Sequence, residues 1–321
     1  MKVCIYGAGA IGAYLGVALI DAGCKVSMVA RGPHLEAMRK NGLTLESEGT
    51  TRTVELRCTA DPAELGEQDY VILTLKAHSV APAVDAIGKL LGPDTAIVTA
   101  QNGILWWYFY ALPGPWENRH LETADPGGKI WQALDPKRAI GCVVYPSCDL
   151  VAPGFVRHTG GNRFMLGEPS GEKSERVKAL AEAMAAGGLK APVRPRIRDD
   201  IWFKLLGNAT FNPVSVLTGA TLEQMGQDAG VRGVIKKLMG EVEQVGEKLG
   251  VRFPMELDKR IDGATSVGAH KTSMLQDFEL GRPLELDALV ASVAEIGRLV
   301  AVPTPTLDAL LALVRLKVEL R

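Results

Sequence analysis

The sequence has almost no net charge and few of the residues that build metal sites. Its 36 basic and 37 acidic residues give a formal charge of -1, so nothing in its overall charge attracts nucleic acid or an anionic membrane. Its five histidines are dispersed, without the H-E-x-x-H or H-x-x-E-H spacing of common zinc sites. We therefore expect neither a nucleic-acid partner nor a bound metal.

Cysteine and long apolar runs are also scarce. The five cysteines are scattered and form no C-x-x-C pair, so we interpret them as small buried hydrophobic residues in a reducing compartment. No uninterrupted apolar stretch approaches the roughly 18 residues that a membrane helix needs. The opening residues, MKVCIYGAGAIG, lack the basic, apolar and small-residue regions of a signal peptide. We therefore expect a cytoplasmic protein with no membrane partner.

The first half of the chain alternates β-rich runs with segments of helical period. The 321 residues, 47% of them hydrophobic and 23% charged, suffice for two ordinary globular domains. The alternation predicts a parallel sheet with crossover helices. We expect strands at 2–7, 25–30, 69–77 and 95–103, helices at 10–23, about 34–42, 80–92 and 174–186, a hairpin of 43–47 and 51–60 around Gly49, and two β-runs within 141–167.

The second half predicts helices, because glycines and prolines separate long segments without strand signals. The expected helices are 200–217, 228–249, 255–269, 272–280, 283–300 and 306–320. Strand signals largely stop after KAPVRPR, so we place a domain boundary near Arg196. The predicted fold class is α/β, with an N-terminal Rossmann-type dinucleotide-binding domain at 1–196 and a C-terminal all-helical domain at 197–321.

A glycine-rich loop joins the first predicted strand to the first helix. Gly7, Gly9 and Gly12 form G-x-G-x-x-G, a motif that is specific in this strand-to-helix context. Glycine permits a tight turn and close backbone approach, and the helix N-terminus attracts a pyrophosphate. The alternative is a glycine-rich turn without a ligand. The predicted cofactor-binding residues of the loop are Gly7, Ala8, Gly9, Ala10, Ile11 and Gly12.

Three further strand ends carry polar side chains. The second strand ends in MVARG, so Arg31 stands where an NAD-binding site usually has an acid. A guanidinium there suits the 2′-phosphate of NADP, although a solvated surface arginine is the alternative. Lys76 and Asn102 follow two later strands, at the sheet edge where ligands of such folds collect.

A polar set lies within the apolar stretch IWFKLLGNATFNP (201–213). Lys204, Asn208 and Asn212 recur every four residues, so one continuous helix would place them along a single face. We expect Pro213 to bend or end that helix after Asn212.

A second polar set lies in KTSMLQDFELGRPLELD (271–287). Gly281 and Pro283 suggest a helix stop followed at once by a restart, a geometry that points side chains toward a neighbouring domain. A charged surface turn is the alternative.

Together these motifs resemble the ketopantoate reductase (2-dehydropantoate 2-reductase) family across nearly the whole chain. The matching stretches are GAGAIG (7–12), TLKAHSV (74–80), QNG (101–103), WFKLLGNATFNP (202–213) and SMLQDFELGRPLELD (273–287). The resemblance implies hydride transfer from NADPH to the C2 carbonyl of a 2-oxo acid at a site between the two domains. The default substrate it implies is 2-dehydropantoate, which is reduced to pantoate in pantothenate biosynthesis.

The resemblance also implies roles by position. Lys204 matches the catalytic lysine, whose ammonium would polarise the ketone and protonate the developing alkoxide. Glu285 matches the acidic residue that holds the substrate hydroxyl or the lysine. The other matches are substrate-binding positions (Asn208, Asn212, Ser273 and Asn102) and cofactor-side positions (Lys76 and Asn102). Ser273 matches the contact to the substrate carboxylate.

The segment after QNG, residues 104–131, departs from the family pattern. It holds four of the five tryptophans, and its proline and glycine content predicts a structured loop. Its aromatic side chains either pack against the α/β domain, or shape the cleft or a subunit contact. A different 2-oxo acid or a ketone therefore remains an alternative substrate, and a homodimer through the C-terminal helices remains open. The intact catalytic set disfavours a non-catalytic NADP sensor, and the order of the motifs disfavours a 3-hydroxyacid dehydrogenase.

Overall fold

The computed structural model describes residues 1–321 and divides them into two compact units. Unit 1 comprises Met1–Gln101, Trp106–His120 and Gly128–Ile197. Unit 2 comprises Asn102–Leu105, Leu121–Gly127 and Arg198–Arg321.

Unit 1 is built on a seven-stranded sheet with the order β11-β8-β7-β6-β1-β2-β5. Neighbouring strands run parallel, except that β11 is antiparallel to β8. The strands are β1 (Lys2–Tyr6), β2 (Lys25–Val29), β5 (Arg57–Thr59), β6 (Gln68–Leu73), β7 (Leu91–Thr99), β8 (Ala139–Val144) and β11 (Phe164–Gly167). From β1 the chain adds strands toward one edge, and from β6 toward the other, so the topological switch point lies between β1 and β6. The predicted Rossmann-type α/β fold is confirmed.

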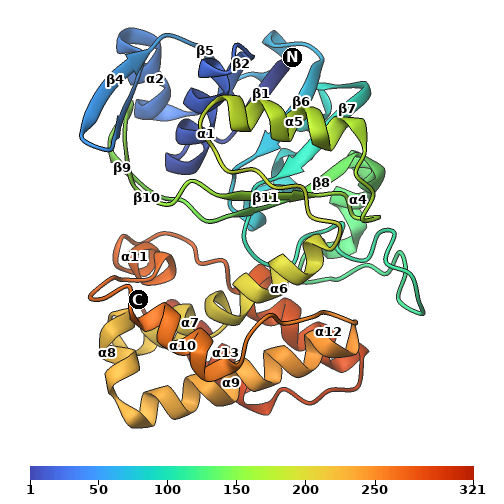
Figure 1. Ribbon diagram of the computed structural model, residues 1–321, viewed down its shortest axis with the longest axis vertical. Helices are drawn as coiled ribbons and strands as arrows, with labels where there is room; N and C mark the ends of the chain where they lie inside the picture. The colour runs from blue at the N-terminus through green and yellow to red at the C-terminus, as the bar shows by residue number, and fades with distance from the viewer. The chain divides into compact units, whose positions relative to one another are not determined.

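Helices cover this sheet, and their apolar faces complete its core. They are α1 (Ala10–Asp21), α2 (Gly32–Asn41), α3 (Val84–Gly88), α4 (Lys129–Leu134) and α5 (Glu175–Ala186), with short 3-10 turns at Pro62–Glu64, Ala77–Ser79, Ala81–Ala83, Pro126–Gly128 and Pro136–Arg138. Figure 1 shows α1 and α5 side by side against the sheet. Their approach is close, because a Cβ added to Gly187 would lie 2.0 Å from the carbonyl oxygen of Ala18. The helix expected at 80–92 is wrong in length, since Pro82 confines the start to a 3-10 turn.

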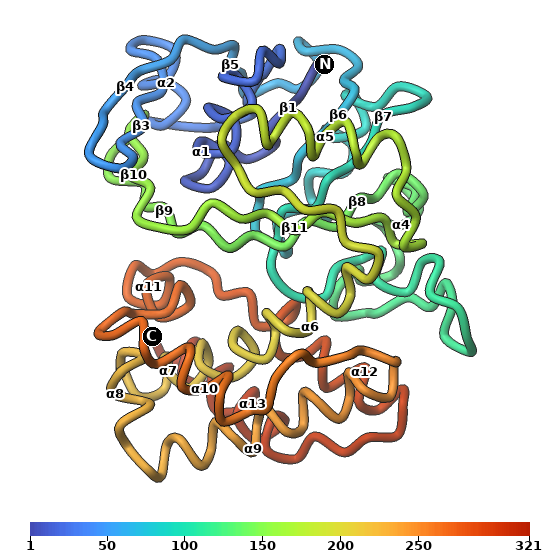
Figure 2. The backbone as a smooth tube through the Cα atoms, in the orientation of Figure 1, coloured from blue at the N-terminus to red at the C-terminus, as the bar shows by residue number.

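A smaller four-stranded sheet has the order β4-β3-β10-β9, and its backbone can be followed in Figure 2. Its strands are β3 (Leu43–Ser47), β4 (Thr50–Val54), β9 (Ser147–Ala152) and β10 (Phe155–Gly160). The hairpin around Gly49 is confirmed, with β3 and β4 antiparallel and Gly49 at a φ of +76°. Two expectations are corrected. Residues 51–60 divide between β4 and β5, which join different sheets, and the region 141–167 contains parts of four strands, β8 to β11.

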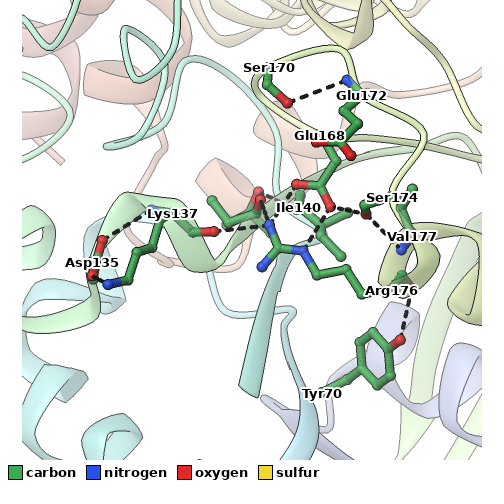
Figure 3. A network of polar contacts seen from close by, with 12 residues as sticks. Tyr70, Asp135, Lys137, Ile140, Glu168, Ser170, Glu172, Ser174, Arg176 and Val177 are labelled. Carbon is green, nitrogen blue, oxygen red and sulfur yellow. Dashed lines mark hydrogen bonds and ion pairs between the residues drawn. The ribbon is translucent and has the colours of Figure 1, made fainter. Parts of the chain in front are cut away.

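One partly buried ion pair ties the end of β11 to the start of α5 (Figure 3). The Glu168 carboxylate accepts bonds from Arg176 Nε at 2.7 Å and Nη2 at 2.6 Å, and from Ser174 Oγ at 2.6 Å. Arg176 Nη2 also donates to the carbonyl of Lys137 at 2.9 Å, and Tyr70 Oη donates to the carbonyl of Arg176 at 2.8 Å. Bonding to Glu168 raises the pKa of the Arg176 guanidinium. This network joins three separate parts of the chain at the edge of the sheet.

Unit 2 is helical around its own core. Its elements are α6 (Ile197–Asn208), α7 (Phe211–Thr218), α8 (Leu222–Gln227), α9 (Ala229–Lys248), α10 (Leu257–Thr265), α11 (Ser273–Glu279), a π-helical turn (Asp287–Ala291), α12 (Ser292–Leu299) and α13 (Pro305–Glu319). Fully buried side chains from four helices form the core, among them Trp202, Val242, Val293 and Leu307. None of the helices in the structure combines the length and apolarity needed to span a membrane.

The continuous helix expected at 200–217 is wrong, because the chain breaks at Ala209–Thr210 between α6 and α7. Pro213 is the third residue of α7, where its missing N–H costs no helical hydrogen bond. In one continuous helix that N–H would have bonded to Ala209, so the proline imposes the break upstream of itself. Asn212 therefore lies on a different helix from Lys204, and Pro213 lies in the first turn of a helix where we expected it to bend or end one.

The boundary between the compact units also differs from the predicted 196/197 division. Residues 102–105 and 121–127 belong to unit 2, although they lie within the N-terminal part of the sequence. Hydrogen bonds explain the difference, because Ile104 N–H bonds to the carbonyl of Ala288 and Glu122 N–H bonds to the carboxylate of Glu295.

Candidate active site

The loop between β1 and α1 has the geometry of a phosphate-binding turn. Gly7 has a φ of +109°, and a Cβ added there would lie 3.0 Å from the backbone nitrogen of Leu75. A Cβ added at Gly12 would lie 2.4 Å from the carbonyl oxygen of Gly7 and 2.6 Å from Thr74 Oγ1. Thr74 Oγ1 donates to that same carbonyl. Both glycines are therefore required by close approach, one of the roles that the dinucleotide fingerprint gives them.

The N-terminus of α1 is suited to an anion. Gly9 is its N-cap residue, no side chain caps it, and the first turn contains no acidic residue. No heavy atom lies within 4 Å of a Cβ added to Gly9, so the space beside it is open. The N–H groups of this first turn and the positive end of the helix dipole fit a pyrophosphate. These residues could hold a dinucleotide.

Lys76 follows β6, and Gln101, which was not among the predicted site residues, follows β7. Lys76 is the half-buried N-cap residue of the 3-10 turn Ala77–Ser79. Gln101 is 8% exposed and donates from Nε2 to the carbonyl of Leu75 at 2.6 Å. Its buried Oε1 has no hydrogen-bond partner within the protein. Gln101 is the first residue of the QNG motif, and this motif was the signal that could have identified it.

Arg31 is exposed and directly precedes α2, for which it is the N-cap residue. Neither the end of β2 nor the first turn of α2 supplies an acidic residue. Burial raises the pKa of the Tyr6 hydroxyl, and the positive charge of Arg31 opposes that shift. The guanidinium thus stands near the carboxyl ends of β1 and β2, where a 2′-phosphate would need a cation.

In unit 2, Lys204 and Asn102 are brought together. The half-buried ammonium of Lys204 donates from Nζ to Asn102 Oδ1 at 2.6 Å. Asn102 reaches this position because residues 102–105 leave the end of β7 and pack with unit 2. An ammonium oriented in this way can polarise a carbonyl oxygen and deliver a proton to it.

Asn208 is half-buried at the end of α6, one turn beyond Lys204, whereas Asn212 is buried in the first turn of α7. Ser215 Oγ donates to the carbonyl of Asn212 at 2.7 Å and lies 2.6 Å from Thr272 Oγ1. Thr272 caps α11 through Leu275 N–H, so Ser273 is the exposed first residue of that helix.

The pair formed by Ser215 and Thr272 thus joins α7, which carries Asn212, to the helix that begins with Ser273. Neither hydroxyl residue was predicted from the sequence. The threonine immediately before Ser273 was a recognisable N-cap signal.

Glu285 is half-buried between α11 and the π-helical turn. Gly281, with a φ of +71°, follows the end of α11, and the carbonyl of Glu285 accepts Leu289 N–H at 3.1 Å. The expected helix stop is confirmed, but the helix does not restart at Pro283, because residues 282–285 are non-helical. The structure places six of the predicted residues in unit 2, namely Asn102, Lys204, Asn208, Asn212, Ser273 and Glu285, and the glycine loop, Arg31 and Lys76 in unit 1.

The tryptophan-rich segment is a structured loop up to the turn before α4. Trp106 and Trp107 are buried, and Trp107 Nε1 donates to Thr99 Oγ1 at 2.9 Å. A Cβ added to Gly141 of β8 would lie 2.9 Å from the Trp107 ring. Trp107 therefore packs on the large sheet. For this residue, the first of the two alternatives, packing against the α/β domain, is the correct one.

Comparison with known proteins identifies the same family in both parts of the chain. The family model Ketopantoate reductase PanE/ApbA matches residues 3–106, and the model Ketopantoate reductase PanE/ApbA C terminal matches residues 196–318. A 2-dehydropantoate 2-reductase of Mesorhizobium japonicum is 57% identical over 316 residues, which are 98% of this chain and 97% of that protein.

Two solved structures extend the comparison. A candidate ketopantoate reductase from Ralstonia solanacearum MolK2 has 45% identity and a TM-score of 0.94, covering 99% of this chain and 98% of that one. D-mandelate dehydrogenase, solved with NADH and anilino(oxo)acetate, shares the fold with 22% identity and a TM-score of 0.84, covering 99% of this chain and 98% of that one.

Proposed function

Because the chain belongs to the ketopantoate reductase family, we propose that it reduces the C2 carbonyl of 2-dehydropantoate to give pantoate, with NADPH as the reductant. The 57% identity with the Mesorhizobium japonicum enzyme over 98% of this chain supports the substrate. The observation that carries the chemistry is the 2.6 Å hydrogen bond from Lys204 Nζ to Asn102 Oδ1, because it orients the ammonium of the lysine. Both residues belong to unit 2, as do the other predicted substrate-binding residues.

We assign the residues of unit 2 to the substrate. Lys204 would polarise the ketone and protonate the alkoxide as it develops, and its proton loss would be restored from solvent. Asn208 and Asn212 would donate hydrogen bonds to the substrate, and Ser273 would contact its carboxylate. Glu285 would hold the substrate hydroxyl or the Lys204 ammonium by charge-assisted bonding.

We assign the glycine loop, Arg31 and Lys76 to the dinucleotide, which would supply the hydride when bound. The open N-terminus of α1 would hold the pyrophosphate. Arg31 would hold the 2′-phosphate and so favour NADPH over NADH. The absence of an acid at the end of β2 supports this preference, since a carboxylate there would repel that phosphate.

Two further proposals concern the setting of the enzyme. A cytoplasmic location is supported by five free cysteines, of which burial raises the pKa of Cys4 and of Cys148 to about 12. A homodimer is supported by α13, which exposes Leu313 and Leu316, and by the exposed Leu320 that directly follows it. Molar mass by light scattering would test the dimer.

The experiment that tests the function is a panel of 2-oxo acids with purified protein, followed by loss of NADPH absorbance. We expect the highest kcat/KM with 2-dehydropantoate. Faster turnover of an aromatic or unbranched 2-oxo acid would reassign the substrate within the same chemistry. Binding of NADPH without turnover of any member would contradict the proposed enzyme.

A further inference from the structure

The helical residues that follow Glu285 bind two segments from earlier in the sequence, 102–105 and 121–127, both of which belong to unit 2. Three residues of this face are Ala288, Ser292 and Glu295, spaced by four and three positions and so stacked along one side of a helix. We call them the positioning stripe. The Ala288 carbonyl contacts residues 102–105, the Glu295 carboxylate contacts residues 121–127, and Ser292 bonds to the Ala288 carbonyl. All of these residues belong to unit 2.

The first contact is made by the carbonyl of Ala288, in the π-helical turn Asp287–Ala291. This oxygen accepts Ile104 N–H at 2.9 Å and Ser292 Oγ–H at 2.8 Å, and Ser292 is fully buried. Gly103 has a φ of +89°, and a Cβ added there would lie 2.3 Å from the same oxygen. Residues 102–105 therefore pack against the π-helical turn at a distance that only glycine permits at position 103. Such π-turns are frequent at functional sites.

The second contact is made by the Glu295 carboxylate, on the next turns of the same face. Its Oε1 accepts Glu122 N–H at 2.9 Å, and its Oε2 accepts Thr123 N–H at 2.9 Å and Thr123 Oγ1–H at 2.5 Å. Three donors on one ionised carboxylate form a charge-assisted clamp on residues 121–127. Both segments that bracket the tryptophan-rich residues 106–120 are thus held by one helix.

Asn102 immediately precedes Gly103, so the seating of that glycine sets the position of Asn102 Oδ1. We infer that the positioning stripe aims the Lys204 ammonium, by fixing the amide oxygen that accepts its hydrogen bond at 2.6 Å. Ser292, Glu295 and Gly103 are then positioning residues, which act on Lys204 through Asn102. This inference rests on the proposed function in taking Lys204 as the proton donor.

Glu295→Gln tests the stripe without adding volume. A glutamine keeps one acceptor oxygen and turns an N–H₂ group toward the backbone donors, so the clamp on 121–127 loosens. We expect kcat to fall by about 10- to 100-fold, the scale of a misplaced catalytic group, while NADPH affinity stays nearly unchanged. Gly103→Ala should act in the same direction and more strongly, because its Cβ must displace Ala288.

Glu241→Gln is the matched control. The Glu241 carboxylate of α9 likewise accepts two backbone N–H groups, from Thr306 at 2.9 Å and Leu307 at 2.8 Å, but it does not hold residues 102–105 or 121–127. We expect it to lower Tm about as much as Glu295→Gln and to leave kcat nearly unchanged. Equal losses of kcat in the two variants, or no loss in Glu295→Gln, would overturn the inference.

A second readout separates this inference from the proposed reaction. In protein labelled with ¹³C-lysine, the Lys204 signal can be assigned from its absence in Lys204→Arg, and its shift reports on the ammonium without substrate. The stripe predicts that Glu295→Gln moves this signal and that Glu241→Gln does not. If the wild type reduces no 2-oxo acid, the proposed function fails while the stripe is still judged by this signal. An unmoved Lys204 signal in Glu295→Gln would refute the stripe even if the reductase activity were confirmed.

Discussion

Lys204 and Asn102 lie 102 positions apart in the sequence and are joined by a 2.6 Å hydrogen bond from Nζ to Oδ1. An asparagine that accepts this bond with its oxygen presents its N–H₂ group elsewhere, so the amide can orient the lysine and still donate to a ligand. The pair thereby gives a reason for the second letter of QNG.

Removing the ammonium should abolish most turnover without harming dinucleotide binding. We predict that Lys204→Ala lowers kcat by at least about 100-fold, since it removes the general acid. NADPH affinity, measured by fluorescence titration, should be nearly unchanged. Lys236→Ala is the control, because Lys236 is exposed and pairs with Asp258 at 2.6 Å. A Lys204 variant with the kcat of the control would show that another group donates the proton.

Arg31→Ala should alter the choice of dinucleotide. The exposed guanidinium can pair with a 2′-phosphate, which NADPH has and NADH lacks. We predict a rise in Kd for NADPH that is much larger than the rise for NADH, measured for both by titration. Lys40→Ala is the control, because Lys40 is an exposed residue in the last turn of α2, the helix that Arg31 precedes. It should change neither Kd. Equal weakening of the two dinucleotides in Arg31→Ala would refute the phosphate assignment.

The sequence predicted the fold where local patterns determine it. The G-x-G-x-x-G turn and the glycine hairpin at Gly49 depend on neighbouring residues, and both were located correctly. The break before Phe211 was missed, because the expected pattern of polar residues every four positions passes across it, and a proline also fits the first turn of a new helix.

The membership of residues 102–105 and 121–127 in unit 2 could not be predicted in the same way. It depends on hydrogen bonds to Ala288 and Glu295, which lie far away in the sequence and leave no local pattern. The same holds for the Lys204–Asn102 bond, since each residue was picked out by its own motif and neither motif indicates the other.

The Glu168–Arg176 ion pair should contribute measurably to stability. Arg176→Leu would leave a carboxylate that is 4% exposed without its cation, although Ser174 would still donate to it. We predict a loss of about 3 kcal/mol in the free energy of unfolding, at the low end for a broken buried pair, because the Arg176 side chain is itself 32% exposed. Urea unfolding measures this loss. Arg157→Leu, which breaks the exposed pair with Glu46, should cost much less, and equal losses would contradict the structural role.

His34 should make unit 1 less stable in mild acid. Its Nδ1 accepts Gly154 N–H at 2.9 Å, so the ring is neutral with its proton on Nε2. Burial lowers the pKa of this imidazole below its ordinary value of 6.5, and the nearby backbone of Ala8 opposes the shift. Near and below pH 6.5 the unfolded chain therefore binds more protons at this position than the folded chain does. The free energy of unfolding falls as pH decreases from about 6.5 toward the lower pKa of the folded state.

The variant His34→Gln isolates this contribution, because the amide oxygen of glutamine can still accept Gly154 N–H but does not titrate. We predict that the free energy of unfolding declines less steeply in the variant than in the wild type between about pH 7 and pH 5. His78→Gln is the control, since His78 is exposed. Urea unfolding at a series of pH values gives the two slopes. Parallel curves for wild type and His34→Gln would show that the acid sensitivity of unit 1 arises at other groups, whereas a flatter curve confined to His34→Gln would assign it to the imidazole beside the glycine loop.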